Sequence, residues 1–91
     1  MFDWDKHNLA KIRRHKIRRR EVEYVLANAP ILIYEQDAGS ELRYAYYGET
    51  DAGRMLAVIV TERADMIRVV TAYELDAGQK REYLLRRIKG E

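Results

Sequence analysis

Residues 42–60, LRYAYYGETDAGRMLAVIV, decide the fold class of this chain. At the start of the stretch, Leu42, Tyr44 and Tyr46 alternate with a second set of side chains, with the period of two expected of a β-strand. Residues 55–60 are apolar at every position, which predicts a central strand covered on each side or by its neighbours. Because residues 50–53 read as a turn between these two runs, the stretch predicts a hairpin in the middle of the chain.

Two further runs extend this hairpin to four antiparallel strands. Residues 31–35 form a short β-rich run after the only proline, and residues 37–40 turn the chain toward the hairpin. Residues 67–72 form the last strand, after a turn at Ala64-Asp65. If that turn has two residues, Thr61 lies opposite Arg68 on one face of the sheet.

Two helices are predicted before the strands. Residues 5–14 can form a short helix with Asp5 as its cap, and residues 18–28 form a second helix. The second helix has its apolar residues at the 3–4 spacing of a single stripe, namely Val22, Val25, Leu26 and Ala29. The segment between the two helices, which contains His15, is expected to be a joint.

A last helix follows the strands. Asp76 and Gln79 have the spacing of a capping box, so we expect a helix over residues 79–88 that docks on the sheet through Leu84 and Ile88. The predicted fold class is therefore α+β, with two N-terminal helices, a four-stranded antiparallel meander and a C-terminal helix. The length predicts one domain, residues 1–91.

Composition sets the expected environment. Cysteine is absent, so neither disulfides nor thiolate metal sites are available. No stretch approaches the roughly 20 apolar residues that a membrane span requires. Residues 1–5 lack the basic start and apolar middle of a signal peptide. We therefore expect a cytoplasmic protein with no membrane partner.

The net charge is +2, but the cations are unevenly distributed along the chain. The first cluster surrounds His15 and consists of Lys11, Arg13, Arg14, Lys16, Arg18, Arg19 and Arg20. The second cluster lies at the end of the sequence and consists of Lys80, Arg81, Arg86, Arg87 and Lys89. Clustered cations favour a polyanionic partner, either a nucleic acid or an acidic protein. A solvated helix face is the alternative explanation for such a cluster.

Several classes of enzyme find no support in the sequence. His7 and His15 lie eight residues apart without a metal-protease pattern, and no carboxylates cluster with ligand-like spacing. The glycines stand singly, so there is no Gly-rich phosphate loop, and the only serine, Ser40, falls in a turn. We therefore expect neither a metal nor a cofactor.

Arginines, lysines, tyrosines and a histidine are a set of side chains suited to RNA. Arginine binds phosphate bidentately, tyrosine stacks on unpaired bases, and histidine exchanges protons near neutral pH. RNA also supplies its own nucleophile, the 2′-hydroxyl, so a protein can cleave it by moving protons and neutralising phosphate charge. His15 is the candidate acid or base, although a residue in a joint is also often a local cap.

Other candidates have structural alternatives as well. Arg68 interrupts an apolar strand, so it either binds phosphate or pairs with an acidic residue on the sheet. Because Thr61 would lie opposite Arg68, the two residues could together form a small anion site. Arg54 begins a strand beside a turn, and a position exposed to solvent explains an arginine there as well as a function does.

The aromatic residues have structural explanations too. Trp4 is expected to anchor the first helix in the core. At least two of Tyr44, Tyr46 and Tyr47 are expected to pack in the sheet.

These residues fall in segments that resemble the BrnT family of bacterial toxins. Phe2-Asp3-Trp4-Asp5 with Lys6, Asn8 and Lys11 resembles the family's opening, and Arg14-His15 stands where the family has a Lys-His pair. The further similar segments are Arg43-Tyr44, Gly48-Glu49-Thr50, Gly53-Arg54, Thr61-Glu62-Arg63, residues 67–72 and Lys80-Arg81-Glu82-Tyr83. Tyr73 replaces the arginine that ends one family motif, which is a departure that bears on activity.

The resemblance implies a RelE-like fold and a ribonuclease that arrests translation. It also implies that a BrnA-like antitoxin neutralises the toxin, and that the toxin contacts DNA only through this antitoxin. In the leading hypothesis Arg54 and Arg68 hold the phosphate of the RNA, His15 acts as acid or base, and Tyr73 assists. The residues expected to bind or steer RNA are Arg14, Lys16, Arg63, Lys80 and Arg81. The alternative is a non-catalytic basic domain, either a degenerate toxin or an adaptor for RNA or an acidic protein.

Overall fold

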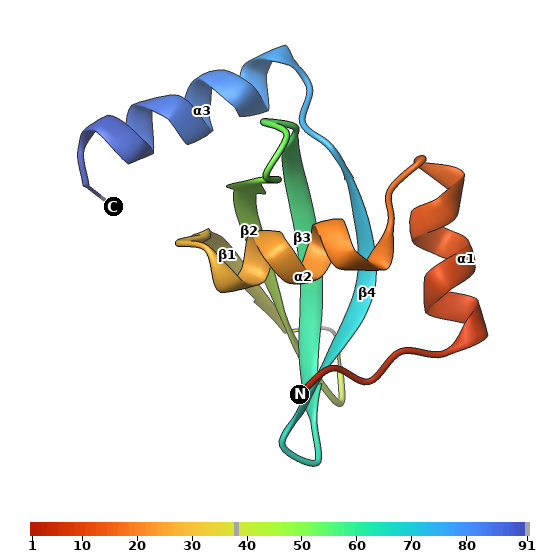
Figure 1. Cartoon of the computed structure of the whole chain (residues 1–91). Coiled ribbons are helices and arrows are strands. Elements are labelled where there is room, and N and C mark those ends of the chain that lie inside the picture. The colour runs from red at the N-terminus through yellow and green to blue at the C-terminus, as the bar shows by residue number, and fades with distance from the viewer. Residues whose placement is uncertain (38, 91) are drawn as a thin grey trace.

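The computed structural model of the chain describes residues 1–37 and 39–90. Over these residues the elements follow the predicted order of two helices, four strands and a helix (Figure 1), which confirms the α+β prediction. Their bounds are α1 (Lys6–Arg14), α2 (Arg19–Ala27), β1 (Ile31–Asp37), β2 (Leu42–Glu49), β3 (Met55–Arg63), β4 (Met66–Glu74) and α3 (Ala77–Ile88). The turn predicted at 37–40 includes Ala38, which lies outside the described residues. No helix of the described part is long and apolar enough to cross a membrane.

The four strands form one antiparallel sheet in the order β1-β2-β3-β4, so every strand pairs with its neighbour in sequence. Ala64 and Asp65 both have positive φ angles, 52° and 64°, as a tight two-residue hairpin turn requires. This turn sets the β3–β4 register and places Thr61 opposite Arg68, as predicted. On its outer edge, β4 makes an isolated bridge with Phe2.

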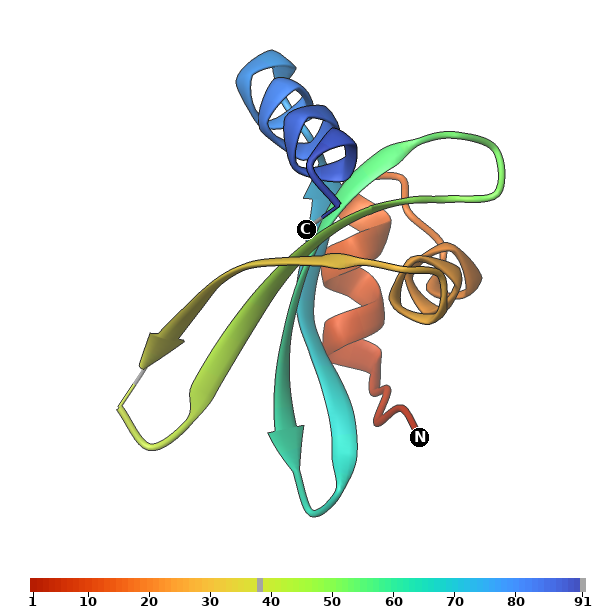
Figure 2. The ribbon, with the colours of Figure 1, turned by 90° about the vertical axis from the view of Figure 1, so that its left-hand side faces the viewer.

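Both N-terminal helices lie on the same side of the sheet (Figure 2). The core beneath them combines residues of the helices and the strands: Ile12, Ile17, Val22, Val25, Leu56, Val58, Val60, Val69 and Ala72. Two of the four predicted stripe positions of α2, Val22 and Val25, are fully buried. Trp4 packs against this core, and its indole Nε1 donates a hydrogen bond to Glu23 at 2.8 Å.

The helix starts follow the local signals in the sequence. The Asp5 side chain accepts a hydrogen bond from the Asn8 backbone N–H at 2.8 Å and caps α1. Asp76 and Gln79 exchange both hydrogen bonds of a capping box at the start of α3. Both signals need only neighbouring residues, which is why they could be predicted.

The prediction that α3 docks through Leu84 and Ile88 is wrong. Leu84 is 41% exposed and Ile88 is 82% exposed, whereas Tyr83 is 4% exposed and is the buried residue of the helix. Tyr83 packs in a second, smaller core cluster that includes Tyr47 of β2 and Leu75, which leads from β4 into α3. Because successive residues of a helix point about 100° apart, seating Tyr83 on the sheet turns Leu84 toward solvent.

The second core cluster covers only one end of the second sheet face. Residues directly opposite in an antiparallel pair share a face, so Tyr47, Ala57 and Tyr73 form one row across β2, β3 and β4. This row belongs to the cluster under α3. The next rows on the same face, Ala45–Ile59–Thr71 and then Arg43–Thr61–Arg68, lie toward the far hairpin ends. Polar side chains gather on this part of the face.

Candidate functional site

The joint between α1 and α2 presents the first basic cluster. α1 ends with three cations in its last turn, Lys11, Arg13 and Arg14, where the partial negative charge of a helix C-terminus favours them. His15 is the C-cap and uses its backbone N–H, which donates to the carbonyl of Ile12 at 3.0 Å. Its exposed imidazole is therefore not needed for the cap.

A pocket of about 360 Å³ lies between this joint and the sheet. Lys11 and His15 are four residues apart, so they share one face of α1, while Arg43 comes from β2 and Thr71 from β4. The lining residues are Lys11, Arg14, His15, Arg43, Val70 and Thr71. The pocket thus combines three permanent cations, an imidazole and a hydroxyl, which is an arrangement suited to an anionic ligand.

Tyr73 lies beside this pocket. The ring centroids of His15 and Tyr73 are 6.3 Å apart and their planes are inclined by 55°. Tyr73 follows Thr71 by two residues on β4, so both side chains point to the same face of the sheet. Tyr73 also packs against the core cluster under α3, which restricts its movement next to the imidazole.

Arg43 links the pocket to the end of β3. Its guanidinium hydrogen-bonds Glu41 at 3.3 Å, and the same carboxylate lies 3.9 Å from Arg63. Arg63, predicted to bind RNA, is exposed and shares Glu41 with Arg43, so it lies near the pocket without lining it. The shared carboxylate neutralises part of this charge, so a phosphate at Arg43 would compete with Glu41.

Arg54 contributes to the architecture of the joint. Its Nη1 donates to the backbone carbonyl of Lys16 at 3.1 Å and to Glu21 at 2.9 Å, and its Nη2 donates to Glu74 at 2.8 Å. The hydrogen bond with Glu74 and the ion pair with Glu21 raise the pKa of Arg54. Two carboxylates thus balance a charge that the sequence hypothesis assigned to phosphate, and the carbonyl bond fixes the residue next to His15.

Arg68 is engaged in a similar way at the other end of α1. Its guanidinium lies 2.9 Å from Asp5 and 3.6 Å from Asp3. The Asn8 backbone hydrogen bond and Arg68 itself lower the pKa of Asp5. The Thr61 hydroxyl opposite Arg68 donates to the Leu42 carbonyl at 2.7 Å. Both groups of the suggested anion site therefore have partners within the protein.

The structure does not bring the four predicted catalytic residues into one cluster. Asp5, the partner of Arg68, caps the start of α1, and His15 caps its end. The nine-residue helix between them spans about 13 Å. Tyr73 and Arg54 lie near the His15 end, whereas Arg68 lies near the other end.

The predicted RNA-binding residues are divided among three places. Arg14 lines the pocket, and Arg63 lies near it because it pairs with Glu41, the partner of Arg43. Lys16 lines a separate hollow of about 560 Å³ between the two N-terminal helices, whose other cations are Arg13, Arg18 and Arg19. Lys80 and Arg81 lie on α3, which crosses above the sheet in Figure 1, whereas α1 lies beside β4.

Three polar lining residues were not among the predicted site residues, namely Lys11, Arg43 and Thr71. The four-residue spacing of Lys11 and His15 was a signal that they share a helix face. Arg43 and Thr71 had no comparable signal, because their place beside α1 depends on the sheet register.

The α+β fold therefore carries a cationic pocket with an imidazole and a neighbouring phenol, and such a pocket suits an anionic ligand. The family model described as "Ribonuclease toxin, BrnT, of type II toxin-antitoxin system" matches residues 4–78. The chain therefore belongs to the BrnT family of ribonuclease toxins, as the sequence resemblance indicated. A comparison with curated proteins finds no match. Membership of a type II toxin family implies an RNA target and an antitoxin partner.

Proposed function

We propose that the protein is an endoribonuclease that cleaves RNA without a metal ion at the pocket beside α1. The observation that carries this proposal is the convergence of Lys11, Arg14 and Arg43 on His15, with Tyr73 as its neighbour. These groups supply what transesterification at phosphorus needs: positive charge for the phosphate, a base for the 2′-hydroxyl and an acid for the leaving oxygen.

The proposed reaction uses neutral His15 as the base. His15 takes the proton of the 2′-hydroxyl, and the 2′-oxygen forms a bond to phosphorus as the bond to the 5′-oxygen breaks. The three cations stabilise the charge that develops on the phosphate oxygens. The Tyr73 phenol protonates the departing 5′-oxygen, and His15 then returns its proton to Tyr73. The products are a 2′,3′-cyclic phosphate and a 5′-hydroxyl end.

Arg54 acts in this scheme as a positioning residue, because it bonds the Lys16 carbonyl next to His15. Direct phosphate contact by Arg54 or Arg68, and RNA contact by Lys16, Arg63, Lys80 and Arg81, are sequence predictions that this cleavage scheme does not require. In this proposal the protein acts on its RNA substrate in the cytoplasm. A BrnA-like antitoxin is the proposed partner that neutralises the toxin, and DNA is contacted only through that antitoxin.

The test compares purified variants on RNA in the presence of EDTA. His15→Ala is expected to lower the cleavage rate by about 10²–10⁴-fold, the usual contribution of a general base. His7→Ala is the matched control, because His7 is an exposed residue of the same helix and does not line the pocket. The cleaved ends are analysed for the cyclic phosphate. Loss of cleavage with EDTA, or full activity of His15→Ala, would contradict the proposal.

A second candidate function is RNA binding without cleavage. It is favoured by the ion pairs that occupy Arg54 and Arg68, the two arginines first expected on the phosphate. This candidate predicts that the wild-type protein binds RNA and leaves it intact. It also predicts that His15→Ala binds RNA as the wild type does.

A further inference from the structure

A groove of about 800 Å³ lies between the start of β1 and one face of α3. We call it the β1–α3 groove. Its strand side is apolar, with Pro30, Ile31 and Leu32, of which Leu32 is 41% exposed. β1 is an edge strand of the sheet, so this side also presents an unpaired strand edge.

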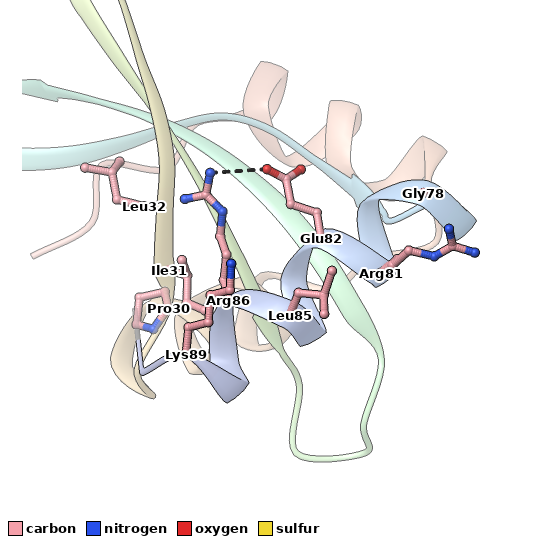
Figure 3. Close-up of a pocket in the computed structure, with 9 residues that line it drawn as sticks. All are labelled: Pro30, Ile31, Leu32, Gly78, Arg81, Glu82, Leu85, Arg86 and Lys89. Carbon is pink, nitrogen blue, oxygen red and sulfur yellow. Dashed lines mark ion pairs between the residues drawn. The ribbon is translucent and has the colours of Figure 1, made fainter.

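The helix side of the groove is mostly basic around one apolar residue. Arg81, Leu85 and Lys89 follow each other at intervals of four residues and so form one row along α3. Leu85 is 51% exposed. Figure 3 shows Arg86 extending from the helix toward Glu82, with which it pairs at 3.3 Å, while Arg81 extends away from β1. Among the residues that the structure describes, Glu82 is the carboxylate that lines the groove and it is already paired, and no ion pair of these residues involves Arg81 or Lys89.

We propose that the β1–α3 groove binds an extended acidic segment of the antitoxin partner. The inferred segment has an apolar side chain midway between two carboxylates, so that the apolar side chain meets Leu85 and the carboxylates meet Arg81 and Lys89. This assignment rests on the proposed antitoxin partner and is independent of the cleavage chemistry.

The spacing of the groove defines the pattern of the segment. Arg81 and Lys89 are separated along the helix axis by about 12 Å, at 1.5 Å per residue. In an extended chain, residues two apart point to the same side and advance about 6.6 Å, so residues four apart span about 13 Å. The matching pattern is acidic–x–apolar–x–acidic. An exposed strand edge such as that of β1 can pair with an extended segment, so the extended form suits the groove.

Charge distinguishes this occupant from a second copy of the chain. In a symmetric dimer the same patch meets itself, so Arg81 and Lys89 of one copy would face the same cations of the other. Such like-charge contacts disfavour association. RNA is disfavoured by the apolar side chains of the groove, because phosphate gains nothing from Leu32 on the strand side or Leu85 on the helix side.

The test uses a synthetic peptide with the pattern Glu-x-Leu-x-Glu and a matched peptide with the pattern Lys-x-Leu-x-Lys. Each peptide is titrated into ¹⁵N-labelled protein carrying His15→Ala, and amide shifts are followed by NMR. The glutamate peptide is expected to shift amides of residues 30–32 and of α3, whereas the lysine peptide leaves them in place. Because the protein carries His15→Ala, the result does not depend on cleavage.

Charge reversal then checks the contacts. Arg81→Glu combined with Lys89→Glu is expected to weaken binding of the glutamate peptide by at least about tenfold, or about 1.4 kcal/mol. Lys80→Glu changes a charge on the same helix outside the groove and is expected to alter the affinity less than about twofold, as an exposed charge does. Equal binding of both peptides, or shifts confined to the pocket beside α1, would overturn the proposal. So would a single-stranded RNA that shifts the groove amides and displaces the glutamate peptide.

Discussion

At the scale of single residues, Gly48 shows how closely α2 packs on the sheet. A Cβ atom at this position would lie 2.6 Å from Cγ1 of Val25 on α2. Val25 is fully buried, and a valine side chain has little rotamer freedom in a helix, so it cannot move aside easily. The glycine therefore sets how near α2 comes to β2.

Gly48→Ala is expected to destabilise the protein by about 1–3 kcal/mol, the usual cost of overpacking a core. Gly78→Ala is the control, because a Cβ there meets only Asp76 Oδ1 at an ordinary 3.5 Å. Urea unfolding of both variants measures the difference. If Gly48→Ala were as stable as Gly78→Ala, α2 would pack less tightly on β2 than described.

At the scale of elements, Glu21 connects the start of α2 to the strands. Burial opposes its ionisation, but the hydrogen bond from the Arg18 backbone and the ion pair with Arg54 outweigh it and lower the pKa of Glu21 below its ordinary 4.5. A carboxyl with a lowered pKa in the folded state stabilises that state above its unfolded pKa. This stabilisation is lost as the pH falls through the folded pKa.

Glu21→Gln is therefore expected to cost about 1–2 kcal/mol near neutral pH, since it removes charge-assisted hydrogen bonds from a largely buried group. The difference from the wild type should shrink as the pH falls below 4.5 and through the lower, folded pKa. Unfolding free energies measured from pH 7 downward, with exposed Glu35→Gln as control, check this convergence. A difference that stays constant with pH would assign the effect to packing and not to ionisation.

The elements also show what could be predicted from the sequence and why. The Asp5 cap, the Asp76–Gln79 capping box and the two-residue turn at Ala64-Asp65 depend on residues within a few positions, so their patterns were sufficient. The partners of Arg54 lie 33 and 20 residues away in sequence, and Asp5 lies 63 residues from Arg68. No local pattern identifies such partners. The three arginine–carboxylate contacts, like the approach of Arg43 to α1, follow only from the assembled fold.

The face of α3 that docks on the sheet could not be predicted from the spacing of its apolar residues, for a related reason. Leu84 and Ile88 are spaced as an apolar stripe, yet the sheet receives Tyr83, whose hydroxyl lies 3.4 Å from Glu49. Arg87 pairs with the same carboxylate and lies over the Tyr83 ring. These contacts across elements set the rotation of the helix.

At the scale of the whole molecule, the two basic clusters of the sequence occupy different surfaces. The first surrounds the α1–α2 joint, with the cationic pocket on one side and the hollow of Lys16 on the other. The second lies along α3, where three of its members, Arg81, Arg86 and Lys89, line the β1–α3 groove beside apolar residues. The local surroundings therefore favour the proposals of RNA at the joint and an acidic protein segment at α3, although the two clusters look equivalent in the sequence.

Salt dependence of RNA binding separates these surfaces. For single-stranded nucleic acid, the slope of log Kobs against log salt is about −0.7 for each phosphate neutralised. In a His15→Ala background, replacing Lys11, Arg14 and Lys16 by alanine should flatten the slope by about 2, because three contacts are lost. Replacing Lys80, Arg81 and Lys89 removes the same charge and should leave the slope nearly unchanged. Fluorescence anisotropy across a salt series measures both slopes. Equal flattening in the two triple variants would mean that RNA also follows α3, and it would restore Lys80 and Arg81 as RNA contacts.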